Sequence, residues 1–479
     1  MNTAMRNLLI WTAISLAGSG QVALAREASH PAIPTHGVIG VESDQLDADF
    51  WIRRLDQAHA IILDKAAIAA QNARVLHEDP SMHVLAAIPD ELPRKQVLAW
   101  IDGLSTRPTR ALFDAGGKPV SESTLDELMR NIDRDAIPEL QARRPGLVVK
   151  RAAMRTLPTL LRVFSKAGDT DIDRFQESAL FPGTPVMIVH ASHDGQWLFV
   201  VSARYAAWIE ASAVAAGSAA QVDAYASPAR YRIITGATAQ TVFTPELPAV
   251  SKLQLDMGVR VPVLADWPAD KLVNGQHPYA AHVIELPVRL ADGSLDLVPA
   301  LLQKNAESSA DYLPLNEANI IRQAFRFLGE RYGWGHDYDA RDCSGFVSEV
   351  YQSMGVLMPR NTRDQGISPA LRKRLFTAAD DSATRMSAAL ALQPGDLVYI
   401  PAHVMMVIGN IDGQPYVIHD TTGLSYRRDD GSLRRIALNG VSVSPLLPLQ
   451  FSEKETYIDR MTSIVTMRPA QPKDVRQVP

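Results

Sequence analysis

The chain has 479 residues, of which 46% are hydrophobic and 21% are charged. This length exceeds the roughly 100–200 residues of a typical single domain, so we expect several domains, each with its own core. The net charge of -5 provides no basic field to attract a phosphate backbone and argues against nucleic acid as a partner.

Residues 1–25 are typical of an export signal. Arg6 supplies a positive charge, residues 8–17 form a short apolar run, and Ala23-Leu24-Ala25 has the small-x-small pattern of a cleavage site. The run is shorter than the roughly 20 residues that span a bilayer, which favours a cleaved signal over a membrane anchor. We therefore expect an exported protein of the periplasm or cell-wall space, with no stable membrane anchor after cleavage.

Three segments follow the expected signal. Apolar residues at helical spacing predict a helical N-terminal segment over residues 26–147. Residues 148–216 and 217–312 then contain closely spaced β-rich runs, with tight-turn signals at Asp194-Gly195 and Asp292-Gly293. Short strands joined by polar turns are typical of small barrels, so we expect two successive β-barrels.

Residues 313–470 predict an α+β domain, in which helices precede an antiparallel sheet. One amphipathic helix is expected over residues 317–330, and a second from Cys343 to about Met354, ended by Gly355. Strands are expected at residues 397–400, 404–408 and 415–418. The predicted fold is thus multidomain: an α+β domain preceded by two small β-barrels and a helical N-terminal segment.

Cys343 is the only cysteine, so no disulfide can form within the chain. A lone cysteine in an exported protein is either an inert buried thiol or a reagent. Because Cys343 opens a predicted helix, the helix dipole and free N–H groups are expected to lower the pKa of its thiol toward neutrality. The same N–H groups can hold the oxyanion that forms when a thiol attacks a carbonyl.

A thiol nucleophile needs a general base, usually histidine. His403 begins one predicted strand and His419 ends the next, with Asp412-Gly413 as a hairpin signal between them. A two-residue turn would place the histidines on opposite faces of the sheet, whereas an odd loop over residues 410–414 would make them diagonal neighbours on one face. We predict the odd loop, with His403 as base and His419 orienting it. Spacing alone leaves a purely structural role for both histidines equally open.

Several short motifs of residues 315–440 stand in a fixed order. They are Tyr332-Gly333-Trp334-Gly335, Arg341-Asp342-Cys343-Ser344-Gly345-Phe346-Val347, Met358-Pro359-Arg360, Pro394-Gly395-Asp396-Leu397 and His403-Val404. Together they resemble NlpC-type (NlpC/p60) murein peptidases, which are papain-like enzymes of bacterial cell walls. The resemblance implies a papain-like cysteine peptidase with a triad of Cys343, His403 and His419, and with no cofactor or metal.

The barrel region extends this resemblance. Residues 155–159, 173–176 and 190–197 resemble the first of two bacterial SH3-like barrels that precede the peptidase domain in one branch of the family. That branch resembles γ-D-glutamyl-L-diamino-acid endopeptidases. The implied substrate and partner is a peptidoglycan stem peptide, cut between D-glutamate and meso-diaminopimelate or lysine.

The resemblance also implies residues that contact substrate. Tyr332 would line the site and help to stabilise the tetrahedral intermediate, while Asp342 and Ser344 would flank the nucleophile and contact the peptide. Asp342 could equally be a structural charge at the helix N-terminus.

Two positions depart from the family pattern. His336 stands where a second glycine is usual, and is either a cleft residue or a loop residue without a role. Asn361 and Thr362 stand where relatives that trim free peptides tend to have Asp-Ser. A neutral amide offers no carboxylate to a terminal ammonium group, so stem peptides still joined to sugar become candidate substrates beside free ones.

Three other functions remain open from the sequence. Cys343, His403 and His419 could bind zinc in a metal hydrolase, although no His-Glu-x-x-His motif is present. The barrels could be the working part of a cell-wall-binding protein with an inert peptidase domain. A transferase would use the same acyl-enzyme. The oligomeric state has no signature in the sequence.

Overall fold

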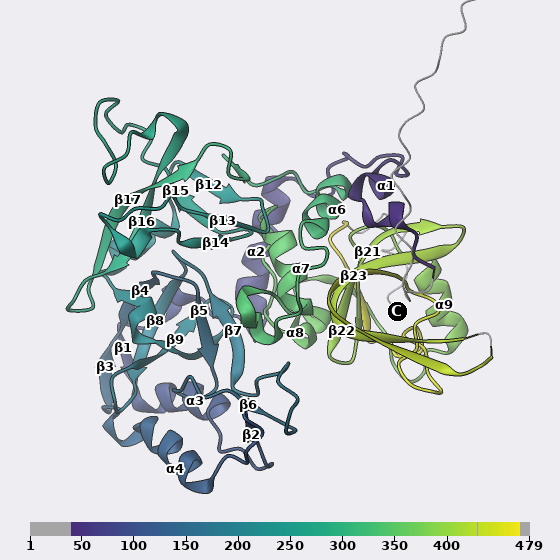
Figure 1. The fold of residues 1–479 in the computed structure, drawn as a ribbon, viewed down its shortest axis with the longest axis horizontal. Helices are drawn as coiled ribbons and strands as arrows, with labels where there is room; N and C mark the ends of the chain where they lie inside the picture. The colour runs from purple at the N-terminus through teal and green to yellow at the C-terminus, as the bar shows by residue number, and fades with distance from the viewer. Residues whose placement is uncertain (1–39, 429, 470–479) are drawn as a thin grey trace, which may run out of the picture.

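The structure is a computed structural model that describes residues 40–428 and 430–469 (Figure 1). The expected export signal at residues 1–25 lies outside the described residues. Within the described part of the chain, no helix is long and apolar enough to cross a membrane.

The first β unit is a seven-stranded antiparallel sheet that spans residues 144–216. Its strand order is β11-β4-β8-β9-β10-β5-β7. The bounds are β4 (Arg144–Val148), β5 (Ala152–Arg155), β7 (Gln176–Leu180), β8 (Pro185–Ala191), β9 (Trp197–Ser202), β10 (Ala206–Glu210) and β11 (Val214–Ala216). Runs of valine, isoleucine and aromatic residues fill the strands, and both faces are covered, which explains why β9 is buried at every position.

The second β unit consists of three small antiparallel sheets around one apolar core. They pair β15-β12-β18, β13-β14 and β16-β17. The bounds are β12 (Tyr231–Ile234), β13 (Thr238–Gln240), β14 (Gln254–Asp256), β15 (Arg260–Pro262), β16 (Ala281–Arg289), β17 (Leu295–Gln303) and β18 (Ser308–Ser309), with α5 (Ala219–Ala226) at the junction with the first unit.

The C-terminal domain packs helices against a six-stranded antiparallel sheet of order β19-β24-β20-β21-β22-β23. The strands are β19 (Arg372–Leu375), β20 (Leu397–Ile400), β21 (His403–Ile411), β22 (Gln414–Arg427), β23 (Leu433–Pro445) and β24 (Ser463–Thr466). The helices are α6 (Glu317–Phe325), α7 (Cys343–Gln352), α8 (Thr362–Ile367) and α9 (Ser382–Leu390). Figure 1 shows α7 at the centre of the molecule, between the β units and this sheet.

Two of the expected elements differ most in length. The predicted helix over residues 317–330 ends at Phe325, because the chain continues in tight turns and then adopts a positive φ at Gly329. The strand predicted at 415–418 is much longer, since β22 pairs with β23 as far as Arg427.

The predicted helical N-terminal segment divides between two bodies. The helices α1 (Ala48–Ile52) and α2 (Lys65–Glu78) bury their apolar residues in the core of the C-terminal domain. In contrast, α3 (Arg94–Leu104) and α4 (Glu122–Asn131) pack on the first β unit. The segment is also not wholly helical, because β1 (Glu91–Pro93) pairs with β3 (Leu140–Ala142), and β2 (Phe113–Asp114) with β6 (Val163–Phe164).

The hairpin between β21 and β22 contradicts the predicted odd loop. Ile411 pairs with Gln414, so the connection is the two-residue turn Asp412-Gly413, with positive φ at both positions. A β-bulge compensates: Val407 pairs with Val417 and Gly409 with Tyr416, which leaves one extra residue in β21. With this extra residue, His403 and His419 lie on the same face of the sheet, as the odd loop was expected to place them. They contact each other there as diagonal neighbours.

Candidate active site

Cys343 is the first residue of α7, and Asp342 fixes this start. The Asp342 carboxylate accepts a hydrogen bond from the backbone N–H of Gly345 at 2.8 Å, which is the usual N-cap interaction. The Cys343 thiol is 5% exposed. Its Sγ accepts a hydrogen bond from the backbone N–H of Val404 and lies 3.5 Å from Oγ1 of Thr362. The thiol therefore lies at the start of β21, beside His403.

The two predicted histidines contact one another directly. Nε2 of His403 lies 2.8 Å from Nδ1 of His419, and Nε2 of His419 lies 3.0 Å from Oγ of Ser444 on β23. Sequence reasoning missed Ser444, because only the pairing of β22 with β23 brings it to His419. With both rings neutral, the hydrogen bonds can run from His403 to His419 to Ser444, which leaves Nδ1 of His403 as an unprotonated base.

The pKa shifts oppose the expected thiolate. Burial and the nearby Asp342 carboxylate raise the pKa of Cys343 to about 12, in spite of the hydrogen bonds from Thr362 and Val404. Burial lowers the pKa of His403 to about 4 and that of His419 well below its usual value. The expectation that the helix N-terminus brings the pKa of the thiol near neutrality was wrong, because burial and the Asp342 charge favour the neutral thiol. At neutral pH the site holds a neutral thiol beside a neutral imidazole.

A cleft of about 650 Å³ opens at His403, whereas the buried Cys343 and His419 do not line it. His403 and Tyr332 line it, together with residues 421–425 at the middle of β22 and residues 435–437 of β23. Tyr332 is buried, and desolvation together with the nearby Cys343 raises the pKa of its hydroxyl, which keeps the hydroxyl protonated as a donor. The structure therefore brings Tyr332 to the predicted triad.

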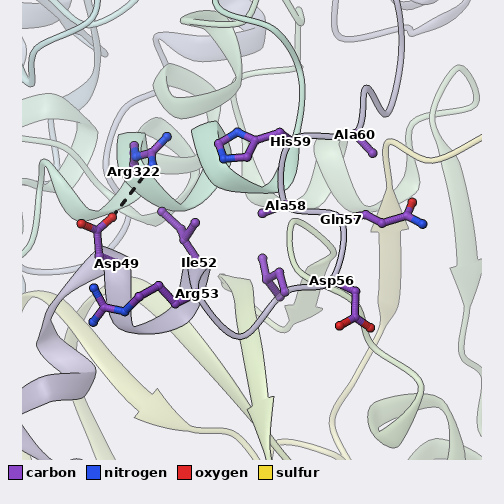
Figure 2. Close-up of a pocket in the computed structure, with 10 residues that line it drawn as sticks. Asp49, Ile52, Arg53, Asp56, Gln57, Ala58, His59, Ala60 and Arg322 are labelled. Carbon is purple, nitrogen blue, oxygen red and sulfur yellow. Dashed lines mark ion pairs between the residues drawn. The ribbon is translucent and has the colours of Figure 1, made fainter.

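A hollow of similar volume lies between α1 and α6, where Asp49 and Arg322 approach to 3.9 Å (Figure 2). Figure 2 shows His59 and Gln57 on the loop that borders it. None of the residues predicted for the active site lines this hollow, so the cleft at His403 is the candidate substrate site.

Asp342 and Ser344 are engaged by Arg360 and do not line the cleft. The Arg360 guanidinium donates to Oδ2 of Asp342 at 2.8 Å and to Oγ of Ser344 at 2.9 Å, and all three side chains are buried. Although burial opposes it, the Arg360 charge lowers the pKa of Asp342 and keeps it ionised. These contacts fit the structural role that the sequence left open for Asp342, and the peptide contacts of Asp342 and Ser344 stay a prediction.

His336 is neither a cleft residue nor a free loop residue. It is 5% exposed, accepts a hydrogen bond at Nδ1 from Arg360 at 2.9 Å, and places Nε2 3.0 Å from Glu349. Burial and the neighbouring Arg360 hold the pKa of His336 well below its usual value. A Cβ on Gly345 would come within 2.6 Å of this ring. His336 thus supports the first turn of α7 from behind.

Arg341, two residues before the nucleophile, was not recognised as a connector of domains. It is fully buried and pairs with Glu349 at 2.8 Å and Glu330 at 2.9 Å. It also reaches Asp256 on β14 of the second β unit at 2.7 Å. A buried arginine with three carboxylates fixes the second unit against the loop that carries Cys343. Its partner in the second β unit, Asp256, is 85 residues away in the sequence, so only the place of Arg341 inside the nucleophile motif could have drawn attention to it.

Asn361 and Thr362 have different positions. Thr362 contacts the thiol, as described above. Asn361 is exposed and donates through Nδ2 to Oδ2 of Asp364 at 3.0 Å. A carboxylate is therefore present one helical turn beyond the neutral amide that the sequence pointed to.

The geometry does not support a zinc site. Both ring nitrogens of His419 have protein partners, which leaves no free lone pair for a metal ion. Across residues 40–428 and 430–469, no group of three or more His, Cys, Asp or Glu side chains is arranged to hold one.

Comparisons with known proteins match the segment of the chain that contains this site. Residues 329–435 match the NlpC/P60 family, and residues 161–210 match an SH3 domain of the SH3b1 type. The protein named "Probable endopeptidase p60" of Listeria seeligeri is 34% identical over 119 residues, which are 24% of this chain and 19% of that protein. Its namesake in Listeria welshimeri is 33% identical over 119 residues, with the same coverage. The chain thus spans about a fifth of the length of these relatives.

A solved structure shares the fold over most of the chain. It is described as a novel NlpC/P60 endopeptidase from Photobacterium damselae subsp. piscicida, and it superposes with a TM-score of 0.70 at 17% identity. The match covers 88% of this chain and 96% of that one. The chain therefore carries an NlpC/P60 family domain at residues 329–435, preceded by an SH3 domain of the SH3b1 type.

Proposed function

We propose that this protein is a cysteine endopeptidase that cleaves peptidoglycan stem peptides between γ-D-glutamate and the diamino acid, meso-diaminopimelate or lysine. The single observation that carries the proposal is that the buried thiol of Cys343 accepts a hydrogen bond from the backbone of Val404, next to His403, while His403 is itself held by His419 and His419 by Ser444. The names of the p60 and Photobacterium relatives, which are endopeptidases, support the reaction class.

The reaction begins with an uncharged thiol on Cys343 and an uncharged imidazole on His403. Sγ of Cys343 attacks the γ-glutamyl carbonyl carbon while Nδ1 of His403 accepts the thiol proton. The backbone N–H groups of Gly345 and Phe346 are taken by Asp342. Within the described structure, this leaves the N–H groups of Cys343 and Ser344 to stabilise the oxyanion, with the Tyr332 hydroxyl as a further donor at the cleft.

Collapse of the tetrahedral intermediate breaks the C–N bond. The imidazolium of His403 gives its proton to the leaving amine of the diamino acid, which departs as a neutral amine. A water molecule then attacks the thioester while His403 accepts one of its protons, and the γ-carboxyl product leaves with the thiol restored. His419 keeps Nδ1 of His403 pointed at the reacting atoms throughout, and no cofactor takes part.

A protein that only binds cell wall is the second candidate, favoured by the SH3b1-type domain at residues 161–210. In such a protein the buried thiol would be inert, as the raised pKa of Cys343 would allow. The two candidates differ in whether Cys343 is needed for function.

The test is mass spectrometry of digests by the mature chain. The substrates are the free tripeptide L-Ala-γ-D-Glu-meso-diaminopimelate and the same peptide attached to its disaccharide. We expect cleavage at the γ-glutamyl bond, absent in Cys343→Ala and His403→Ala, with His59→Ala as a control for an exposed histidine away from the cleft. Binding to sacculi that persists in Cys343→Ala, without cleavage of either substrate by the unaltered chain, would support the binding protein instead.

A further inference from the structure

A second pocket lies behind the catalytic helix, where all three bodies meet. Residues 178–185 and 202–205 of the first β unit line it together with residues 225–226 and 258–260 of the second. The C-terminal domain contributes Tyr312, His336, Gln352, Leu357 and Arg360. The pocket encloses about 300 Å³ and shares no lining residue with the cleft at His403.

The pocket is lined by apolar side chains and by positively charged ones. The walls include Leu85, Phe181, Tyr225, Tyr312 and Leu357. Three arginines face the pocket, Arg204, Arg260 and Arg360, and none of the described lining residues is a carboxylate. Ligand pockets commonly have such a lining, mostly apolar with a few polar groups, at the interface between domains.

Two of the three arginines already have partners. Arg360 is saturated by Asp342, Ser344, His336 and Ser178. Arg260 donates to the carbonyl of Ala226 and lies over the ring of Tyr231.

Arg204 is held more weakly than Arg360 or Arg260. Its one hydrogen bond within the described structure is a 3.5 Å contact from Nη2 to the carbonyl oxygen of Pro359, and its Nε is buried without a partner. A guanidinium carries five N–H donors, so most of the donors of Arg204 are unused.

The two carboxylates whose charges reach Arg204, Asp342 and Glu349, form no ion pair with it because other side chains hold them. Asp342 is held by Arg360, and Glu349 is held by Arg341 and His336. Burial and the like charge of Arg360 lower the pKa of Arg204 to about 10, so that it is still protonated at neutral pH. The pocket therefore contains a cation that the protein itself leaves without a counter-ion.

We propose that this pocket binds an organic carboxylate carried on an apolar or aromatic body, with the carboxylate on Arg204 and the body against Tyr225, Tyr312 and Leu357. A carboxylate matches the fork of a single free guanidinium through two parallel hydrogen bonds. The ligand would touch both β units and the flank of α7, and it would bind independently of the peptidase reaction.

The test is isothermal titration calorimetry of the full mature chain with N-acetyl-L-phenylalanine as the carboxylate probe. Its neutral amide and inorganic phosphate are titrated as separate arms. We expect the carboxylate to bind and the amide to bind at least tenfold more weakly. Equal binding of carboxylate and amide, or tighter binding of phosphate that depends on Arg204, would overturn the assignment.

Substitutions of single arginines test whether the carboxylate binds at Arg204. Arg204→Gln is expected to weaken carboxylate binding at least tenfold, whereas Arg230→Gln, which removes an exposed arginine of the second β unit, leaves it unchanged. Without any ligand, Arg204→Gln should melt at the same temperature as the unaltered chain or higher, because it removes a cation repelled by Arg360. A lower melting temperature, with binding unchanged, would make Arg204 a structural residue and end the proposal. If Arg204→Gln does not fold, Arg204→Lys supplies the same comparison, since it keeps the charge and loses the fork.

Discussion

Nε2 of His403 lies 2.8 Å from Nδ1 of His419, and both rings are neutral at physiological pH because burial lowers the pKa of each. A neutral imidazole in the third position orients the base but adds little electrostatic support to the imidazolium that forms during the reaction. A buried carboxylate would offer both. In the proposed mechanism His419 therefore holds the ring of His403 in place, and Ser444, whose hydroxyl can donate or accept, holds the ring of His419.

These contacts run from His403 to His419 and on to Ser444. We therefore expect a substitution to lower activity less, the further the residue lies from His403. His419→Ala leaves His403 free to rotate and to expose the wrong nitrogen, so we expect kcat to fall by about 10²–10⁴-fold with KM little changed. Ser444→Ala removes one hydrogen bond of about 1 kcal/mol and should cost roughly five- to tenfold. Steady-state kinetics on the stem peptide measure both. A loss in Ser444→Ala as large as that in His419→Ala would contradict the assigned order.

Alkylation should show that the resting thiol is protonated. Because burial and Asp342 raise the pKa of Cys343 to about 12, the thiolate fraction at neutral pH is very small. The rate of alkylation by iodoacetamide should rise about tenfold with each pH unit through the alkaline range, without a plateau near neutrality. The rate is followed by mass spectrometry of the intact chain. A plateau that begins below about pH 8, beneath the usual pKa of a free cysteine, would show an activated thiolate instead.

Two helical glycines should respond to alanine in opposite directions. A Cβ at Gly345 would come within 2.6 Å of His336, which cannot yield because Arg360 and Glu349 hold both its nitrogens. We expect Gly345→Ala to lower the free energy of unfolding by about 1–3 kcal/mol, as overpacking does. A Cβ at Gly103 in α3 would meet no other atom within 4 Å, so Gly103→Ala should raise that free energy by up to about 1 kcal/mol. Urea unfolding of both variants provides the comparison.

Loss of Arg341 should uncouple the second β unit from the active site. Arg341→Met removes the arginine partner of Glu330 and Glu349 and leaves Asp256 with only its 3.3 Å ion pair to Arg151, and both Glu349 and Asp256 are fully buried. Breaking a buried ion pair from one side costs about 3–5 kcal/mol, so a marked fall in melting temperature and activity is expected. Arg107→Met, which breaks two ion pairs with largely exposed carboxylates, is the control and should leave the melting temperature nearly unchanged. Equal effects of the two substitutions would refute a linking role for Arg341.

The sequence predicted the parts of the site that depend on local pattern. The start of α7 at Cys343 follows from its N-cap and apolar face, and β20 has the predicted bounds of residues 397–400. The shared face of His403 and His419 was predicted correctly for the wrong reason. A turn is encoded by local residues such as Asp412-Gly413, whereas the bulge in β21 has only Gly409 as a local signal, since a glycine inside a strand often marks a bulge. It coincides with the close approach of Trp51 from α1, whose ring lies 2.7 Å from a Cβ position on Gly409.

The electrostatics of the site could not be predicted from sequence. The pKa of a thiol at a helix start depends on how deeply the fold buries it, and this depth is set by β21 and α8 from elsewhere in the chain. In the same way, Arg360 decides the roles of Asp342, Ser344 and His336. The motif Met358-Pro359-Arg360 pointed toward the active site, but the sequence did not show which side chains Arg360 contacts.

Because the N-terminal segment is divided, two separate stretches of backbone connect the C-terminal domain with the first β unit. Residues 48–78 belong to the core of the C-terminal domain, and residues 91–142 lie on the first β unit. The backbone therefore passes between these two bodies twice, once through residues 79–90 and once by way of the second β unit. A single proteolytic cut in either crossing leaves the other as a tether, so the two bodies would separate only after both crossings are cut.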